Sequence, residues 1–481
     1  MHGGGLLACT PTTTSTPAVS APRFAVDGAV PERTTLEQGW DDATRRAFWF
    51  APQGSRIMPY VWFAWLEQPD SQALFRSTAY MSMLGYLPAT EGLDNPAGLP
   101  IGFTTETDAK SGEAFLGLTC AACHTNQIDY RGTRYLIEGA PTLANFVLFY
   151  DRLTSALEQT SADDARFARF AERVAGASSG CEAAALRERL RGLTADAVAR
   201  REANALPAHY PEDFTSYARL DAFGNIQNAA SVFAINEPGN GHAPVAPVSY
   251  PFLWSTHQSD VVQWNASAPN TPVIGPLVRN MGEVVGVFGN LRIKPTPWWQ
   301  RLWGHDLSYH STINIPQLGR LEAWVSTLRS PEWPAEFPQP DPALVAEGEA
   351  HYERACAMCH EVIPRDRELA PYVSVKTLVA VVRTDPATAE AALKNIARTG
   401  LLEGHKSKVL AGEPFGPTAR SIDIAVNGVA GVAVAHLREA ARAGVEGERA
   451  SGESLVQLAK RFEEDVAQAV TSRRFSTRPV R

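Results

Sequence analysis

Two short segments of the chain combine two cysteines with a histidine at a spacing that permits covalent chemistry. In both, two residues separate the cysteines and the histidine follows directly: Cys120-Ala121-Ala122-Cys123-His124 and Cys356-Ala357-Met358-Cys359-His360. This pattern is typical of a c-type haem attachment site. With six Cys and eleven His in 481 residues, only about 0.002 chance matches are expected in the chain. A redox dithiol does not need the histidine, and a zinc site needs a second pair of ligands nearby. The sequence therefore predicts two covalently bound haem c groups.

The spacing assigns a role to each residue of the motifs. Each thiol adds to one vinyl group of the macrocycle, and two intervening residues place both sulfurs on one helical turn. The adjacent histidine then points across the ring plane and binds iron as the proximal ligand. Cys120, Cys123, Cys356 and Cys359 are therefore the predicted attachment residues, and His124 and His360 are the predicted iron ligands.

A helix must carry the second motif. Asp341 has the residue type of an N-cap, Pro342 suits the first helical position, and Leu344, Tyr352 and Ala355 fall on one face before Cys356. A similar but shorter pattern of Gly112, Phe115 and Leu118 precedes the first motif. We expect a helical approach at both motifs.

Composition and charge exclude several classes of protein. Apolar residues make up 44% of the chain and charged residues 20%, as in an ordinary globular protein, which excludes a disordered chain, a collagen and a membrane bundle. No apolar run approaches the roughly 18 residues of a membrane-spanning helix. The net charge of -8 is the opposite of the basic stripe that binds nucleic acid, so we expect no nucleic-acid partner.

The pattern of residue types divides the chain into three parts. Residues 1–40 are expected to form a leader and a Thr/Ser/Pro-rich tether, 41–330 an N-terminal haem domain with helical and loop insertions, and 343–481 a C-terminal haem domain that is shortened at its end. The joint is the Pro-rich segment from Ser330 to Pro342, which is stiff and extended. The predicted fold class is mainly α: two cytochrome c-like helical haem lobes with long irregular loops and few short strands.

The first residues bear on location. Leu6-Leu7-Ala8-Cys9 has the form of a bacterial lipoprotein processing site, which predicts a lipid anchor on Cys9. Met1 to Gly5 supply neither the basic region nor the longer apolar core of a full secretory signal, so a mispredicted start codon or a shortened leader is the alternative. Because haem c is attached outside the cytoplasmic membrane, we expect a periplasmic or extracellular protein.

Helical periodicity begins again after the first motif. A helix is expected from Pro141, with a stripe at helical spacing formed by Leu143, Phe146, Val147, Tyr150 and Leu153. We expect this stripe to belong to the core, with a cofactor contact as the alternative. Residues 155–205 are rich in Ala, Arg and Glu and predict one or two exposed helices. From 207 to 320 the sequence turns to Pro, Gly, Asn and Trp, which predicts irregular loops with a few short strands.

Several segments beyond the two motifs point to one family. They are Gln53-Gly54-Ser55-Arg56, Pro59-Tyr60, Trp62-Phe63, Leu118 to Thr125, Gln127-Ile128, Tyr130, Tyr250-Pro251-Phe252-Leu253-Trp254, Gln263-Trp264-Asn265, Asn280-Met281-Gly282-Glu283-Val284, Thr384-Asp385-Pro386, Thr399-Gly400 and Glu403-Gly404. On these residues the chain, from about 45 to 481, resembles the bacterial di-haem cytochrome c peroxidase superfamily, in the branch that includes the di-haem rubber oxygenases.

The resemblance implies where chemistry occurs. It implies that the N-terminal haem has an open or weakly liganded distal face, with candidates for its surroundings in residues 250–290. Glu283 is the expected general acid/base, since a carboxyl can protonate the leaving oxygen of a bound peroxide; a surface carboxylate is the alternative. Trp264 and Phe288 are expected to wall the pocket or carry electrons, with a core aromatic as the alternative for Trp264.

The sequence leaves several candidates for the sixth ligand of the C-terminal haem. None of the six methionines can serve, because none follows His360 and Met358 lies inside the motif. The local candidates are His405 and His436. Family members continue past a segment like Arg474 to Pro479, so a residue beyond Arg481 is a further alternative.

Three functions follow from these expectations. The first is reduction of hydrogen peroxide at the N-terminal haem, with electrons passed through the C-terminal haem from a small donor protein. The second is a dioxygenase that uses O2 to cleave carbon–carbon double bonds of an apolar substrate. The third is a non-enzymatic electron-transfer cytochrome. An acid beside the open haem favours the first function, a wholly apolar pocket the second, and two saturated irons the third.

Overall fold

The structure is a computed structural model that describes residues 28–176, 180–211, 213–263, 266, 268–270, 275–296, 306–374 and 379–449. Cys9, Trp264 and residues 450–481 lie outside these ranges, and the lipid anchor and the role of Trp264 are therefore not addressed by the fold. Residues 28–40 of the predicted tether contribute the strand β1 (Thr34–Thr35), which pairs with β6 (Thr133–Glu138).

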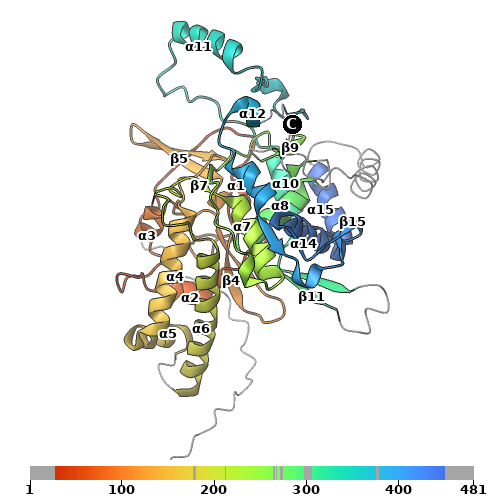
Figure 1. Cartoon of the computed structure of the whole chain (residues 1–481). Coiled ribbons are helices and arrows are strands. Elements are labelled where there is room, and N and C mark those ends of the chain that lie inside the picture. The colour runs from red at the N-terminus through yellow and green to blue at the C-terminus, as the bar shows by residue number, and fades with distance from the viewer. Residues whose placement is uncertain are drawn as a thin grey trace, which may run out of the picture.

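The helices occur along the whole described part of the chain (Figure 1). They are α1 (Asp42–Phe50), α2 (Tyr60–Trp65), α3 (Thr78–Met83), α4 (Phe146–Ala162), α5 (Asp164–Ala175), α6 (Gly180–Ala203), α7 (Ala222–Asn228), α8 (Gly275–Gly286), α10 (Ile315–Val325), α11 (Pro342–Ala355), α12 (Val379–Val382), α13 (Ala387–Lys394), α14 (Ser421–Ala435) and α15 (Leu437–Arg449), with a π-helical stretch, η2 (Ala229–Ala234), after α7.

Small sheets are inserted between the helices. Two have three strands, in the orders β1-β6-β5 and β2-β4-β3. Their remaining members are β5 (Thr125–Tyr130), β2 (Met58–Pro59), β4 (Ala114–Leu118) and β3 (Phe103–Thr107). The two-stranded pairs are β7 (Arg219–Leu220) with β8 (Val248–Ser249), β9 (Val261–Val262) with β10 (Ala268–Pro269), β11 (Leu291–Pro295) with β12 (Leu307–Ser311), β13 (Ile396–Arg398) with β16 (Thr418–Arg420), and β14 (Lys406–Lys408) with β15 (Ala411–Pro414).

The expected mainly α class of two helical haem lobes is wrong, because the fold mixes α and β structure. Strands enclose the first motif: β4 ends two residues before Cys120, and β5 begins directly after His124. The helical approach expected from Gly112, Phe115 and Leu118 is wrong for the same reason. Gly112 has φ +71° and donates its amide to the Asp108 carbonyl at 2.8 Å, so it closes a hairpin between β3 and β4.

The helix expected from Pro141 begins later, at Phe146. The side chain of Asn145 accepts a hydrogen bond from the Leu148 amide at 3.0 Å and caps the helix there. The predicted core stripe is therefore only partly correct: Phe146 and Leu153 are buried, whereas Leu143 is 57% exposed. The helices predicted within residues 155–205 are present as the end of α4, α5 and α6, which lie together at the lower left of Figure 1.

Two clusters of buried side chains form the core and meet at the first motif. The first cluster lies among α1, α8, α10 and α14, and the second among α2, β3, β4 and α4 to α6. Cys120 packs against the first cluster and Cys123 against the second. The first cluster also contains residues on both sides of the Pro-rich segment, from Trp40 to Ala443. The division of the chain into haem domains at residues 330–342 stays a prediction, and residues following that joint return to the core of the preceding block.

Candidate functional site

The two motifs have the same backbone turn. In the first, the amides of Cys123 and His124 both donate to the Cys120 carbonyl oxygen, at 3.1 and 3.0 Å. In the second, the corresponding distances are 3.0 and 2.8 Å, in the turn formed by Cys356, Cys359 and His360. Two segments in different surroundings thus reach one local geometry, which is what a shared chemical role of the motifs requires.

The His124 ring has the tautomer and the charge that a metal ligand needs. Its Nδ1 lies 2.8 Å from the Pro251 carbonyl oxygen, within the segment Tyr250 to Trp254. A carbonyl can only accept, so Nδ1 carries the proton and the lone pair is on Nε2, the arrangement in which imidazole binds a metal. Burial lowers the pKa of His124 to about 4. The ring is therefore neutral near pH 7 and fits the proximal iron ligand predicted for it.

The two thiols of the first motif lie in a low-dielectric environment yet stay partly accessible. The Cys120 thiol donates to Gln53 Oε1 at 3.3 Å. Burial, with a contribution from the Glu283 charge, raises the pKa of Cys123 to about 12 and raises that of Cys120 further. Both side chains remain partly exposed. The cysteines are thus uncharged thiols at the boundary of the two core clusters, and their sulfurs are accessible to the vinyl groups to which they would add.

A glycine packs closely against the backbone turn of the first motif. Gly102 has φ +88°, and a Cβ atom there would lie 2.1 Å from the Ala122 amide nitrogen. Its carbonyl accepts from the Thr119 amide at 2.8 Å. The Thr119 hydroxyl in turn donates to the Trp49 carbonyl at 2.8 Å, which joins the motif to α1. Only glycine permits both this backbone conformation and this close approach.

Glu283 lies in α8 beside the first motif. The Gln263 amide donates to its Oε1 at 3.1 Å, and its charge acts on both thiols of the motif. Burial raises the pKa of Glu283, Arg279 opposes that rise, and Glu322 adds to it. A carboxyl with a raised pKa beside the motif keeps its proton to a higher pH than an exposed carboxyl does.

A buried polar network next to Glu283 was not foreseen from the sequence. Arg279, one turn before Glu283 in α8, donates through Nη2 to Glu322 in α10. Asn280 Nδ2 and His257 Nδ1 also bond to the Glu322 carboxylate, at 2.6 and 3.1 Å. Glu322 could have indicated such a network, because it is a carboxylate among Leu318, Leu321 and Val325 on the apolar face of a helix.

Phe288, which was expected to wall the haem pocket, lines no cavity that the described part of the chain shows. It packs in the second core cluster, with ring centroids 5.7 Å from Phe146 and 5.0 Å from Tyr150. The guanidinium of Arg200 lies over its ring at 5.3 Å. Its surroundings are those of a core aromatic.

The second motif is placed differently from the first. Its helix α11 begins as predicted: the Asp341 side chain accepts from the Ala343 amide at 2.8 Å, and Pro342 is the first helical residue. Yet α11 buries none of its residues, and it stands apart at the top of Figure 1. Leu344 and Met358 are 68% and 84% exposed. An apolar face that packs on nothing in the described part of the chain, next to two thiols, fits a site completed by an apolar ring.

The segment after the second motif returns to the neighbourhood of the first. Glu368 accepts hydrogen bonds from Arg329 and Ser330. Tyr372 donates its amide to the Gln258 carbonyl at 3.0 Å and pairs with Ser259 in a short parallel bridge. The loop that carries Pro251 at one end and Gln263 at the other is thus held by the chain that follows His360.

Each motif supplies two thiols and one imidazole, the set of groups that holds haem c. No group of three or more His, Cys, Asp or Glu side chains within the described ranges is arranged to hold a metal ion, so neither CxxCH motif forms a zinc-type cluster. Of the candidates for a sixth ligand, His405 has a buried Nδ1 with no hydrogen-bond partner in the described structure. His436 instead faces Glu439 at 3.3 Å, at the end of α14.

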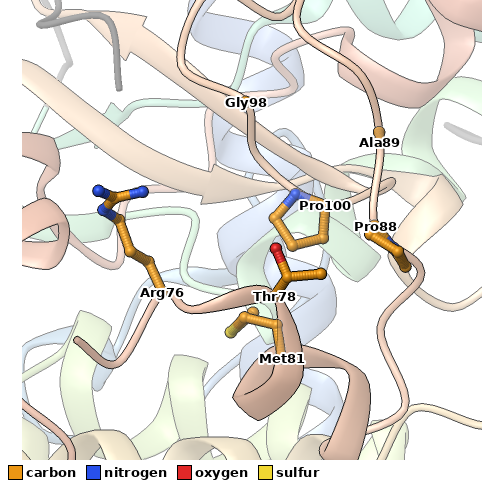
Figure 2. A pocket seen from close by; sticks show the side chains of 7 residues that line it. All are labelled: Arg76, Thr78, Met81, Pro88, Ala89, Gly98 and Pro100. Carbon is orange, nitrogen blue, oxygen red and sulfur yellow. The ribbon is translucent and has the colours of Figure 1, made fainter. Parts of the chain in front are cut away.

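A small cavity lies elsewhere, between α3 and the segment before β3 (Figure 2). Its volume is about 10 Å³, which is room for roughly one water molecule. Its lining is about equally polar and apolar, from Arg76, Thr78, Met81, Pro88, Ala89, Gly98 and Pro100. It is too small to be a substrate site.

Comparison with known proteins gives one informative similarity. The chain is similar to the uncharacterized protein y4iJ of Sinorhizobium fredii, with 32% identity over 354 residues, covering 68% of this chain and 57% of the relative. The chain therefore spans little more than half the length of this relative. No protein-family model and no solved structure matches the chain. Within the described residues, no helix is both long and apolar enough to cross a membrane.

Proposed function

We propose that this chain is a di-haem c-type oxidoreductase that reduces hydrogen peroxide at its first motif. Cys120 and Cys123 would hold one haem and Cys356 and Cys359 the other, with His124 and His360 as iron ligands. A haem bound in this way supplies an iron centre that accepts electrons and delivers them to an oxygen substrate. Reducing peroxide to two water molecules also consumes two protons, and these must come from the protein or from water.

The observation that carries the proposal is the position of Glu283. It is a carboxyl beside the thiols of the first motif, with a raised pKa and an amide donor that fixes one of its oxygens. In its protonated form it can donate to the leaving oxygen of peroxide and recover the proton from solvent afterwards, a contribution of typically 100- to 10,000-fold. A dioxygenase acting on an apolar alkene needs no such acid.

Other groups of the chain would orient the iron ligand and the acid. The Pro251 carbonyl fixes the tautomer of His124, and Gln263 orients the Glu283 carboxyl. Electrons would come from a small donor protein through the haem of the second motif. Because haem c is attached outside the cytoplasm, we propose a periplasmic or extracellular location, with a lipid on Cys9 as the anchor if the chain is held at a membrane.

The test is the turnover of peroxide by Glu283→Gln. We expect at least about a tenfold loss relative to the unchanged chain, with both haems retained. Glu67→Gln is the control for loss of a buried carboxyl, because the Glu67 side chain is buried but pairs with Arg169 of α5 and has no hydrogen bond or ion pair with the first motif in the described part of the chain. Unchanged peroxide turnover in Glu283→Gln, with O2-dependent cleavage of an alkene, would favour the dioxygenase instead.

A further inference from the structure

The Arg279 guanidinium lies between two carboxylates and bonds to only one of them in the described structure. Its Nη2 donates to Glu322, its Nη1 to Asn270 Oδ1 at 2.8 Å, and its Nε to Asn280 Oδ1 at 3.1 Å. All three nitrogens are thus engaged. Glu283, one helical turn away, is within range of the Arg279 charge but receives its hydrogen bond from the neutral Gln263 amide.

Glu322 is held rigidly in this arrangement. It is 4% exposed and lies on the buried face of α10. Arg279 and Asn280 bind one of its oxygens, and His257 lies 3.1 Å from the other. The Asn270 side chain, which accepts from Arg279, also donates to the carbonyls of Thr256 and Ser259 at 3.0 and 2.8 Å. The network therefore joins α8, α10 and the loop that leads to Gln263.

We propose that Glu322 is a positioning residue: it binds the Arg279 guanidinium and so leaves Glu283 without a cationic partner. This inference rests on the proposed function, in which Glu283 must keep a proton. An arginine free to pair with Glu283 would stabilise the carboxylate and abolish the acid. With Glu322 present, Arg279 and Glu322 form a pair with no net charge, and their opposite charges act on the pKa of Glu283 in opposite directions.

The charges around Glu283 agree with this arrangement. From its own helix it faces Arg279, from α10 Glu322, and from the first motif the thiols of Cys120 and Cys123; His257 acts on it through Glu322. The Glu322 charge raises the pKa of Glu283 while Arg279 lowers it, and the same arginine lowers the pKa of Glu322 to about 2 although burial opposes this. Glu322 is therefore the ionised carboxylate of the two.

The experiment measures the proton on Glu283 directly. The infrared carbonyl band of a protonated buried carboxyl is followed against pH in the haem-loaded protein and assigned by its loss in Glu283→Gln. In Glu322→Gln the Arg279 charge is no longer balanced, so the midpoint of this band should fall by at least about one pH unit. In Arg279→Gln the opposite charge remains alone, and the midpoint should rise.

Two further variants separate positioning from folding. The double variant Glu322→Gln with Arg279→Gln removes both charges, leaves no lone buried ion, and should return the midpoint to its original value. Glu67→Gln should leave the midpoint unchanged whatever it does to stability. If Glu322→Gln does not fold, Arg279→Gln still tests the sign. A midpoint that moves in neither single variant overturns the inference, even if both proteins melt earlier.

The failure of this inference is distinguishable from failure of the proposed function. Loss of peroxide turnover in Glu283→Gln with no shift of the band in Glu322→Gln or Arg279→Gln would keep the function and reject the role of Glu322. Opposite shifts in these two variants with full turnover in Glu283→Gln would keep the positioning and reject Glu283 as the acid.

Discussion

The Nδ1 atom of His124 lies 2.8 Å from the carbonyl oxygen of Pro251, a residue 127 positions later in the chain. The contact orients the ring of the predicted iron ligand, and it comes from a loop instead of from the motif. The same loop continues to Gln263, which binds Glu283. One loop thus positions both the ligand and the proposed acid of the first site.

The pH dependence of peroxide turnover should report Glu283. A general acid works in its protonated form, and the raised pKa of Glu283 keeps that form populated above the usual carboxyl range. Turnover should therefore be highest on the acid side and fall as pH rises through the raised pKa. Steady-state rates across pH measure this, and Glu283→Gln should lack that falling limb. A limb that persists in Glu283→Gln assigns the titration to another group.

Gly102→Ala should damage the first site selectively. The substitution puts a Cβ 2.1 Å from the Ala122 amide nitrogen at φ +88°, so the turn of the motif must shift. We expect loss of the first haem and a lower melting temperature. Both are measured by haem absorbance per chain after denaturation and by thermal unfolding.

Gly112→Ala is the control for that variant. Gly112 also has a positive φ, +71°, but a Cβ there meets nothing within 4 Å. Its cost should be limited to backbone strain of about 1–2 kcal/mol. Equal haem content and equal melting temperature in the two variants would show that the contact between Gly102 and Ala122 does not matter.

Local features of this fold could be predicted from the sequence, and long-range ones could not. The start of α11 at Asp341 and Pro342 is confirmed because a cap is a contact within one turn. The helix predicted before the first motif is wrong. Gly112, Phe115 and Leu118 have helical spacing, but the chain forms a hairpin there. Only the pairing of β4 with β3, which residue spacing does not encode, decides between these structures.

In the candidate site, too, local features could be predicted from the sequence and long-range contacts could not. The motif residues are identified by their spacing alone, and Glu283 was placed near them only through resemblance. The contacts that give these residues their properties come from far along the chain: Gln53 to Cys120, Pro251 to His124, and Glu322 to Arg279. A carboxylate such as Glu322 on a buried helical face signals that a partner exists, but it does not say which.

Stability should depend on pH through Glu138. This side chain is 1% exposed and binds Trp49 Nε1, and burial raises its pKa to about 7 from 4.5. The folded chain therefore keeps a proton that the unfolded chain loses. Unfolding free energy should fall as pH rises from about 4.5 to about 7, by roughly 3 kcal/mol at most. Chemical denaturation at several pH values measures this.

Glu138→Gln should remove that part of the pH dependence. Arg45, which faces Glu138 at 3.1 Å, keeps its ion pair with Asp42 in the variant. The unfolding free energy of Glu138→Gln should thus vary less over the same pH interval than that of the unchanged chain. An identical decline in both proteins would mean that Glu138 is ionised in the folded state throughout.

The central claim is that each motif carries one covalent haem, and the mass of the denatured chain tests it most directly. The unchanged protein, produced with haem-attachment machinery, should carry two haem groups that survive denaturation. The pair Cys120→Ala with Cys123→Ala should carry one, and so should the pair Cys356→Ala with Cys359→Ala. A denatured chain of unmodified mass, or two haems retained in either double variant, would contradict the account.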